Sequence, residues 1–589
     1  MYQIAICLAI AFLTSVSGCT KTTQPLSENS GISSITSNSN SSSSGLSEEP
    51  VQYYMNQYAN DNGSSVSFGV TKSINLYEPG EKIEYYFILK GDAYKQGKAT
   101  VTFYNKKFEI NDVQELTFKA GTGLPVTGSF TATKNGVYRV KLEIPDTRRT
   151  MFLFIGVYPK AKQVANSSFY YGIQPYLAEV FNSLRVSNRE GYSVLWQTID
   201  WLGCNLIRDG VSWTAMQDDT DSDVKFTMSD RLVKDADKRG IVLDWLICGT
   251  PEWAVSEKYM AEVEGWSKPP DLEAWEKYIK AVAEHYKDSD NIFYEIWNEP
   301  DWEFWTGTIE EYLAFLELSA KTIKAADPNS YVFPGGMASG YDLTNAAKKG
   351  SEVYYNKYKK LLVDFNLSIL SSKDSSIYYK KYKELLDRKL IDNYAIHVHG
   401  PFDDQLFFDS FERIDNLTDA AGLVHNKSFI TEAGTWNPND EEQAVELMGK
   451  VLWSRANDYK MFVAYTFRAF DGVATRDWFD MMSSNLEPRE SFIAYANLIH
   501  MLGQAEYKEK IADQKSLYAD IYQAGSQFIV PVFSSVNGDR SLRIREGLEF
   551  EAFDILGNEV AVINNQLTVT KSVVYLVFNS SVAAGDFTY

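Results

Sequence analysis

Three patterns of apolar and polar positions follow one another along the 589-residue chain. From about residue 51 to 160, short alternating runs are separated by turn residues such as Asn135-Gly136, which is typical of antiparallel strands. The runs include SVSFGVT, KIEYYFIL, KATVTFYN, GVYRVKLEI and MFLFIGVYP. No helical period is sustained among them. The pattern therefore predicts an N-terminal β-sandwich domain over residues 51–162.

After Val164, apolar strand-like runs alternate with amphipathic helical segments. One such helix is expected at 271–287, where apolar residues recur at helical spacing. Another begins at the capping-box pair Thr308 and Glu311. Eight runs are interpreted as buried strands, and they lie at 169–174, 204–210, 241–247, 292–298, 331–336, 393–399, 428–434 and 462–467. Eight strand–helix units predict a (β/α)8 TIM barrel over residues 163–505, with catalytic residues at the C-terminal ends of its strands.

Short alternating runs return beyond residue 505. They include QFIVPVFSSV, SLRIREG and VVYLVF, and Asn537-Gly538 and Gly557-Asn558 are turn signals between such runs. We therefore expect a small C-terminal β-sandwich domain over residues 506–589, packed on the barrel.

Two glutamates stand at the ends of predicted barrel strands. In NIFYEIWNEPDW, the apolar run 292–297 leads into Asn298 and Glu299, and Pro300 ends the strand. In SFITEAGTW, a second strand leads into Glu432. A retaining glycosidase needs two carboxyl groups that flank a sugar bond, one as acid/base and one as nucleophile. The two strand ends predict that pair.

The spacing of the two glutamates agrees with the predicted barrel. They are 133 residues apart. Strands four and seven of an ordinary barrel lie about 94 residues apart, which leaves an excess of about 40. The Lys/Tyr-rich, helix-patterned segment 345–390 accounts for that excess as an insertion between strands five and six. Glu299 and Glu432 are therefore assigned to strands four and seven.

The Asn-Glu-Pro triplet after an aromatic strand resembles glycoside hydrolase clan A. PEWA, WNEPD and the histidines of strand six are most similar to family 39 within that clan. The resemblance covers about three-fifths of the chain. It implies that Glu299 is the acid/base, Glu432 the nucleophile, Asn298 a ligand of the sugar 2-hydroxyl, and Arg208 the residue that orients the nucleophile.

Two positions depart from the clan pattern. Strand six of the clan often carries His-x-Tyr, with the Tyr bonded to the nucleophile, whereas this chain has His397 and His399. Both histidines face one side of the strand and are kept as candidate substrate-binding residues. The end of strand eight lacks the usual Trp, and Phe467 and Arg468 stand there instead. Without an HExxH motif or a third nearby histidine, no metal site and no cofactor are expected.

Tryptophans follow several predicted strands, where they could stack on sugar rings or pack in the core. Those in the expected mouth loops are Trp213, Trp253, Trp302, Trp305 and Trp436. The presence of five tryptophans in such loops favours the interpretation that some of them stack on sugar rings. Trp253, Trp302 and Trp436 are our candidate substrate-binding residues.

The first 50 residues predict export. An apolar run at 4–16 has signal-peptide length and is too short to span a bilayer. The sequence Val-Ser-Gly-Cys that ends at Cys19 resembles a bacterial lipoprotein signal, which implies a signal over 1–19 and lipidation of Cys19. The chain start carries no Lys or Arg, so a plain secretory signal remains an alternative. Residues 20–50 are Ser/Asn-rich and predict a disordered tether. The expected location is the bacterial cell envelope, on the periplasmic or surface face of the outer membrane.

The amino-acid composition limits the binding partners that we expect. The formal charge of -21 argues against nucleic acid and anionic membrane surfaces, because both are polyanions. Cys204 and Cys248 lie in apolar runs and are expected as buried thiols rather than a disulfide or metal pair.

The leading hypothesis is a monomeric, envelope-anchored retaining glycoside hydrolase that acts on β-linked polysaccharides or oligosaccharides. Its only membrane contact would be the lipid. The alternative is a non-catalytic carbohydrate-binding surface lipoprotein on a degenerate barrel. A scaffold built from β-domains would leave the barrel mouth unexplained.

Overall fold

The computed structural model describes residues 56–589 with gaps. The gaps are 60–64, 91–96, 106–108, 119–123, 145–148, 167, 179–187, 221, 261–266, 303, 339–373, 403–404, 424–427, 436, 470–478, 485, 515 and 539. The predicted signal (1–19), the predicted tether (20–50) and most of the predicted insertion (345–390) lie outside the described residues.

Eight parallel strands form the central sheet, in the order β14-β13-β12-β11-β10-β17-β16-β15. A bridge between Met337 and Ile396 joins the two outer strands and closes the barrel. The strands are β10 (Tyr170–Ile173), β11 (Leu206–Asp209), β12 (Val242–Ile247), β13 (Ile292–Ile296), β14 (Tyr331–Pro334), β15 (Ala395–His397), β16 (Phe429–Ala433) and β17 (Met461–Ala464). Each overlaps one of the eight predicted runs, which confirms the predicted TIM barrel.

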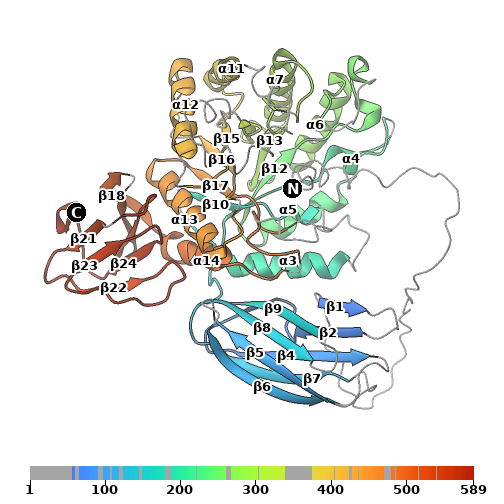
Figure 1. Ribbon diagram of the computed structural model, residues 1–589. Helices are drawn as coiled ribbons and strands as arrows, with labels where there is room; N and C mark the ends of the chain where they lie inside the picture. Colours follow the sequence, from blue (N-terminus) through green and yellow to red (C-terminus); the bar gives the residue numbers. More distant parts are fainter. Residues whose placement is uncertain are drawn as a thin grey trace.

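Helices surround the barrel on its outer side (Figure 1). They are α3 (Asn188–Leu202), α4 (Trp213–Met216), α5 (Thr227–Asp237), α6 (Leu272–Tyr286), α7 (Ile309–Ala326), α11 (Ser375–Asp387), α12 (Gln405–Ala421), α13 (Asp440–Ala456) and α14 (Glu490–Leu502). The predicted capping box is present, since Thr308 accepts from the backbone of Glu311 and Glu311 accepts from that of Thr308. Short 3-10 turns η2 (Glu252–Ala254) and η3 (Glu257–Tyr259) follow β12.

Two stacked antiparallel-rich sheets lie below the barrel in Figure 1. The first sheet holds β1 (Asn56–Ala59), β2 (Ser65–Val70), β4 (Lys82–Lys90) and β7 (Val126–Thr131). The second holds β3 (Leu76–Tyr77), β9 (Arg149–Val157), β8 (Gly136–Ile144), β5 (Gly97–Tyr104) and β6 (Ile110–Phe118). Their inner faces share one aromatic-rich core, as alternating strands require.

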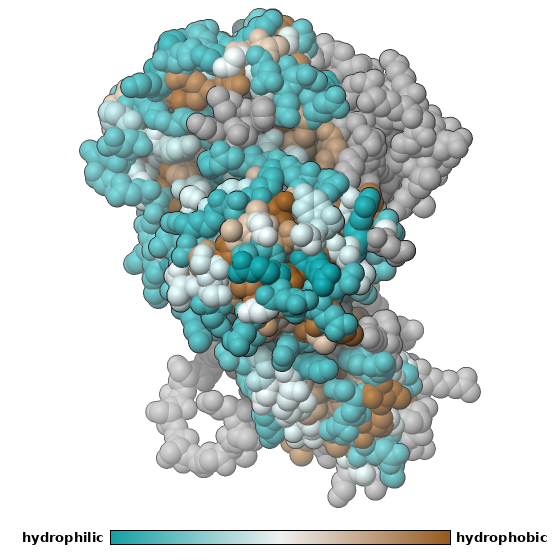
Figure 2. All heavy atoms as spheres, turned by 90° about the vertical axis from the view of Figure 1, so that its left-hand side faces the viewer, coloured by the Kyte–Doolittle hydropathy of each residue, from teal (hydrophilic) through white to brown (hydrophobic). Residues whose placement is uncertain are grey.

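A C-terminal β-domain lies to the left of the barrel in Figure 1. Its larger sheet holds β18 (Glu506–Gln514), β19 (Leu517–Ala524), β20 (Gln527–Phe533), β24 (Val574–Phe578) and β22 (Phe550–Phe553). Its smaller sheet holds β23 (Gln566–Val569), β21 (Arg540–Ile544) and β25 (Phe587–Thr588). Figure 2 faces this domain and shows a surface covered mostly by hydrophilic residues, with small separate apolar patches.

The three parts meet around α14. Tyr158, from the segment that leaves the N-terminal domain, donates a hydrogen bond to Asn497 of α14 at 3.0 Å. The amide of Asn497 in turn donates to the carbonyl of Ile555 in the C-terminal domain at 3.1 Å. Asn135 and Asn558 join the two β-domains directly through reciprocal backbone–side-chain bonds of 2.9 and 3.1 Å. Both β-domains are thus fixed to the barrel and to each other.

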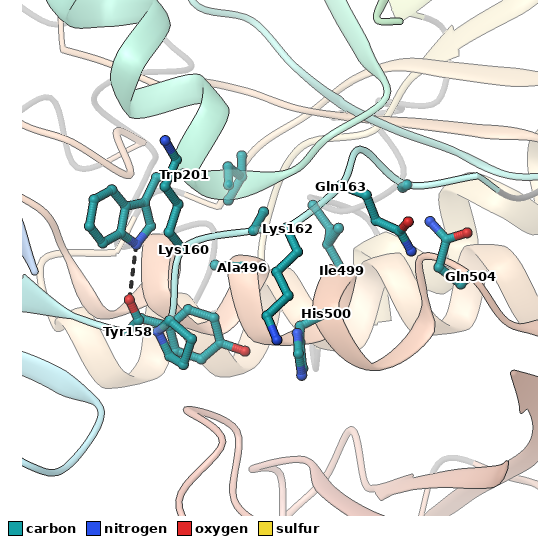
Figure 3. Close-up of a pocket in the computed structure, with 13 residues that line it drawn as sticks. Tyr158, Lys160, Lys162, Gln163, Trp201, Ala496, Ile499, His500 and Gln504 are labelled. Carbon is teal, nitrogen blue, oxygen red and sulfur yellow. Dashed lines mark hydrogen bonds between the residues drawn. The ribbon is translucent and has the colours of Figure 1, made fainter. Parts of the chain in front are cut away.

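A cavity of about 410 Å³ lies at this junction, between the segment 158–165 and α14 (Figure 3). Its polar lining includes Lys160 and Lys162, and Figure 3 shows Lys162 extending toward His500. Neighbouring segments lead into the N-terminal ends of β10 and β11. In TIM barrels that end supports stability, and catalysis occurs at the other.

Within the described residues, no helix combines the length and apolar character needed to cross a bilayer. Cys204 and Cys248 are free and buried, as predicted.

The barrel interior changes from apolar to charged along its axis. An apolar layer that includes Leu206, Phe293 and Phe429 fills one level. Farther along the strands, Asp244 of β12 and Glu295 of β13 lie fully buried. Neither carboxylate oxygen of Asp244 has a hydrogen-bond partner among the described residues. Burial and the neighbouring Glu295 therefore hold the pKa of Asp244 well above its ordinary value, although Arg208 opposes this.

Asp244 thus carries a proton in the folded state that the unfolded chain releases above about pH 4. Its stabilising effect is complete below that pH and is lost as pH rises toward the raised folded pKa. Asparagine has nearly the same shape as aspartic acid but does not titrate, so Asp244→Asn removes this pH dependence of the unfolding free energy. We expect the unfolding free energy of Asp244→Asn, relative to wild type, to grow by ~1 kcal/mol per pH unit between pH 5 and 8 in urea denaturation.

The exposed Asp288 offers a matched control, because Asp288→Asn removes an acid from the surface of the same barrel. A difference for Asp244→Asn that stays constant with pH would show that Asp244 is ionised in the folded protein.

Candidate active site

Glu299 follows β13 through a strained turn. Trp297 and Glu299 have φ angles of 75° and 38°, in the left-handed region that side-chain-bearing residues rarely adopt. The ring of Trp297 is fully buried and donates its Nε1–H to the carbonyl of Phe304 at 2.5 Å. The amide of Glu299 donates to Gly336 O at 3.2 Å. Burial of the indole and these bonds hold a conformation that backbone preference alone disfavours.

His397 and Glu432 lie where the neighbouring strands β15 and β16 lose regular register. The two residues pair across the strands next to a register shift, and β16 carries a second irregularity against β17. Such irregularities re-aim side chains and are common beside active sites. Here they turn both side chains into the barrel mouth, where Glu432 is 8% exposed and His397 is 1% exposed.

Arg208, at the C-terminal end of β11, is the cation at the centre of the site. Its Nε donates to Glu295 Oε2 at 2.5 Å, and its Nη1 donates to Glu432 Oε1. Its remaining bonds reach Gln174 Oε1 at 3.0 Å and Asn298 Oδ1 at 2.8 Å. The guanidinium is fully buried. A buried cation requires such complete pairing, because an unpaired charge away from water is very costly.

Glu432 is held as a carboxylate. Burial alone would favour its neutral acid, but the charge of Arg208 and the neighbouring His399 outweigh burial and hold the pKa of Glu432 well below its ordinary value. The carboxylate is therefore ionised at any pH near neutrality.

A chain of hydrogen bonds connects Glu299 to Glu295. Thr431 donates its hydroxyl proton to Glu295 Oε1 at 3.0 Å. That hydroxyl must therefore accept from His397 Nε2, which lies 3.1 Å away. Burial lowers the pKa of His397 to about 3, so the imidazole is neutral and carries one ring proton. With that proton on Nε2, Nδ1 is an acceptor.

The acceptor Nδ1 of His397 faces Glu299 Oε1 at 2.7 Å. A contact this short needs a proton between the two atoms, and only the carboxyl group can supply it. With this direction of the bonds, the chain places the shared proton on Glu299. Burial raises the pKa of Glu295, the far end of the chain, although its ion pair with Arg208 and the hydrogen bond of 3.0 Å that it accepts from the backbone of Gly336 oppose this.

His399 holds its own proton on the opposite side of Glu432. The backbone N–H of Gly434 donates to His399 Nδ1 at 3.1 Å. Nε2 therefore bears the ring proton, and it lies 3.6 Å from Glu432 Oε2. This separation exceeds an ordinary hydrogen bond, and catalytic contacts of ligand-free enzymes often shorten on substrate binding.

One atom from each of Glu299, His397, His399 and Glu432 lies within 4.8 Å of the others, a grouping that could surround a metal ion. The proton positions oppose this. A metal-binding imidazole must offer a lone pair, but Nε2 of His399 carries a proton and Nδ1 of His397 accepts one from Glu299. The donor set therefore fits proton handling better than zinc.

The tryptophan predictions need correction. Trp213 and Trp305, expected as sugar platforms, are 0% and 1% exposed. Trp213 stacks on Tyr278 inside the helical layer, and Trp305 packs edge-to-face on Trp297. Both rings are part of the core because α4 and α7 bring them against other aromatic side chains.

The other aromatic predictions have different outcomes. Trp253 and Trp302 are half-buried and retain some exposed surface, whereas Trp436 lies outside the described residues. At the end of strand eight, Phe467 and Arg468 are buried. Among the described residues, that strand therefore presents neither side chain as an open sugar platform.

Several site residues were missed by the sequence interpretation. They are Gln174, Asp244, Glu295, Gly336 and Thr431. A signal existed for two of them, because Asp244 and Glu295 are charged residues inside otherwise apolar buried strands, where a charge is rarely tolerated without a function. Gly336 has a steric signature only in three dimensions, since a Cβ there would lie 2.1 Å from His397 Nε2.

Much of the barrel matches a known protein family. Residues 179–464, which include Glu299 and Glu432, match the model of the cellulase family, glycosyl hydrolase family 5. A β-xylosidase of Caldicellulosiruptor saccharolyticus is 34% identical over 82 residues, which are 13% of this chain and 16% of that relative. The chain thus matches only a small part of the relative's length.

The structure of a family 39 glycoside hydrolase from the gut symbiont Bacteroides cellulosilyticus WH2 superposes with a TM-score of 0.56. It is 15% identical and covers 86% of this chain and 99% of its own. At that identity the likeness shows a shared fold. The family model and the structural neighbour come from different families, 5 and 39, of the clan that the Asn-Glu-Pro strand resembles. The barrel of this chain is a clan A glycoside hydrolase domain.

Proposed function

We propose that the protein is a retaining β-glycoside hydrolase with Glu299 as acid/base and Glu432 as nucleophile. The observation that carries the proposal is the closeness of the two carboxyl groups, since one oxygen of Glu299 lies within 4.8 Å of one oxygen of Glu432. Retaining glycosidases hold these groups about 5–5.5 Å apart, whereas inverting enzymes need about 6.5–9.5 Å to admit a water. The short separation supports direct attack by a carboxylate.

The two carboxyl groups also differ in protonation in the way that double displacement requires. Glu432 is ionised beside Arg208, so it can attack an anomeric carbon. Glu299 holds a proton against the lone pair of His397, so it can protonate a leaving oxygen. Environments that push two carboxyl groups apart in this way mark the acid and the nucleophile.

In the first step, an oxygen of Glu432 bonds to the anomeric carbon while the bond to the leaving oxygen breaks and that oxygen takes the proton of Glu299. In the second, Glu299 takes a proton from water, the water oxygen bonds to the anomeric carbon, and Glu432 leaves as a carboxylate. Between the steps the Glu299 carboxylate faces the lone pair of His397 Nδ1. That repulsion favours proton uptake and makes Glu299 a better base.

The proposed substrate is a β-linked oligosaccharide or polysaccharide. Asn298 Oδ1 accepts from Arg208, which leaves the amide nitrogen facing away from the guanidinium. A donor there suits a sugar hydroxyl, and the clan resemblance assigns it the 2-hydroxyl. Half-buried Trp253 and Trp302 are proposed to stack on sugar rings. The β-xylosidase match supports the β-linkage.

A carbohydrate-binding protein without turnover is the second candidate. Such a protein would have no need to hold one carboxyl group protonated and the other ionised, and this division favours the enzyme. Hydrolysis of aryl β-glycosides or polysaccharides by the purified protein separates the two candidates.

Replacing either glutamate should abolish turnover without unfolding the barrel. We expect Glu299→Gln and Glu432→Gln each to lower kcat/KM by about 10³-fold or more, while the circular dichroism spectrum and melting temperature stay near wild type. Steady-state kinetics on an aryl β-glycoside measures the effect. The exposed Glu276→Gln is the matched control, and wild-type turnover in either site variant would contradict the assignment.

Azide distinguishes the two roles. With azide added, Glu432→Ala should yield an α-glycosyl azide, because azide attacks the face that the nucleophile has vacated. Glu299→Ala should yield the β-anomer from the glycosyl-enzyme. Exchanged products would reverse the two assignments.

The short carboxyl separation predicts net retention at the anomeric centre. Proton NMR during hydrolysis of an aryl β-glycoside should show the β-anomer of the released sugar before mutarotation. An α-anomer as first product would show that water attacks directly.

We also propose that the protein is anchored in the cell envelope through a lipid on Cys19, as its N-terminal sequence suggests. Wild-type protein should partition into the detergent phase of Triton X-114, and Cys19→Ala should move it to the aqueous phase. Aqueous partition of the wild type would leave the plain secretory signal as the explanation.

A further inference from the structure

The backbone of Gly434, two residues after Glu432, contacts three groups around the site. Its N–H donates to His399 Nδ1 at 3.1 Å. Its carbonyl accepts from the ammonium of Lys450 at 2.7 Å and from the backbone of Gly400 at 3.1 Å. A Cβ at this position would lie 2.5 Å from the carbonyl oxygen of Tyr465. Only glycine therefore fits in this close approach.

Lys450 of α13 reaches Gly434 from outside the barrel, and its side chain is fully buried. Burying an ammonium is unfavourable, and burial lowers the pKa of Lys450 to about 7 despite Glu446 one helical turn away. A methionine would fill the same space without that cost. Stability alone therefore does not explain a lysine here, whereas its bond to the Gly434 carbonyl does.

The carbonyl bond restrains a residue that has no side chain to hold it. With the Gly434 oxygen fixed by Lys450, rotation about Gly434 is limited and its N–H stays directed at His399. That donor in turn forces the ring proton of His399 onto Nε2. The ring is further flanked by Tyr465 and Phe479, with centroid separations of 5.4 and 6.0 Å.

We propose that Lys450 and His399 are positioning residues for Glu432: Lys450 fixes Gly434, Gly434 sets the tautomer of His399, and His399 presents an N–H to the carboxylate. The inference rests on the proposed function of Glu432 as nucleophile. It means that a neutral imidazole, locked by a backbone amide, supplies the donor at the position where the clan often carries a tyrosine.

The bond from His399 would restrain Glu432 Oε2, while Arg208 restrains Oε1. Two donors on the two oxygens define the plane of the carboxylate and hence its approach to the anomeric carbon. Loss of one donor should impair the transition state more than the bound substrate, because reaction rates depend steeply on the geometry of attack.

Lys450→Met tests this series of contacts at Lys450, the residue farthest from Glu432. We expect kcat to fall about tenfold with KM within about twofold of wild type, and a melting temperature at or above that of wild type, since an isosteric apolar side chain replaces a buried charge. His399→Phe should lower kcat by at least as much. A purely structural lysine would instead give a lower melting temperature with unchanged kcat.

Lys324→Met is the matched control. Lys324 also donates to a backbone carbonyl, that of Ser330 at 2.6 Å, but just before β14 at the opposite end of the barrel. This variant should lose stability and keep its kcat. An equal loss of kcat in both lysine variants would overturn the specific role of Lys450.

The tautomer is measured without any catalysis. Nitrogen-15 NMR of histidine-labelled protein, with the signal assigned through His399→Phe, should show a protonated Nε2 and an unprotonated Nδ1 for His399. Lys450→Met should give a mixture of the two tautomers. A protonated Nδ1 in wild type, or a spectrum unchanged in Lys450→Met, would overturn the inference. Failure of Glu432 as nucleophile would leave this spectrum unaltered, so the two proposals fail separately.

Discussion

The buried guanidinium of Arg208 is the constraint on which the rest of the site depends. A cation that is fully removed from water must find anionic and polar partners in every direction. Here these are Glu295, Glu432, Gln174 and Asn298, contributed by three strands of the barrel and the residues directly after them. Each partner is thereby fixed in orientation. Burial of the Arg208 charge is unfavourable, and the pairing that offsets it also makes the mouth of the barrel rigid.

Arg208 also decides where the protons lie. Asp244, whose carboxylate oxygens have no hydrogen-bond partner among the described residues, has a raised pKa because burial and the neighbouring Glu295 outweigh Arg208. Thr431 donates to Glu295, and the bond direction then passes through His397 to Glu299. The charges around Arg208 are thus linked by hydrogen bonds to Glu299, the proposed acid, while Arg208 itself bonds Glu432, the proposed nucleophile.

The barrel, and the positions of Glu299 and Glu432 at the ends of β13 and β16, could be predicted from sequence because both leave a one-dimensional trace. Buried parallel strands are continuous apolar runs, and a carboxylate such as Glu299 directly after one is conspicuous. The sequence carries no comparable signal of which tryptophan side chains are exposed. Trp213 and Trp305 follow strands as sugar-binding residues would, yet neighbouring helices bury them. Glu295 was visible as a charge in an apolar strand, but its partner at Arg208 was not.

Proton positions were beyond the sequence for a different reason. His397 and His399 look equivalent as an alternating pair, and only their contacts distinguish them. Each ring lies close to the backbone of a glycine, Gly336 or Gly434, where any side chain would collide. Gly336 allows His397 to reach Thr431, and Gly434 brings a backbone N–H to His399. His397 and His399 therefore have different hydrogen-bonding roles, although their side chains are identical. His397 accepts from Glu299, the proposed acid, and His399 offers its own proton to Glu432, the proposed nucleophile.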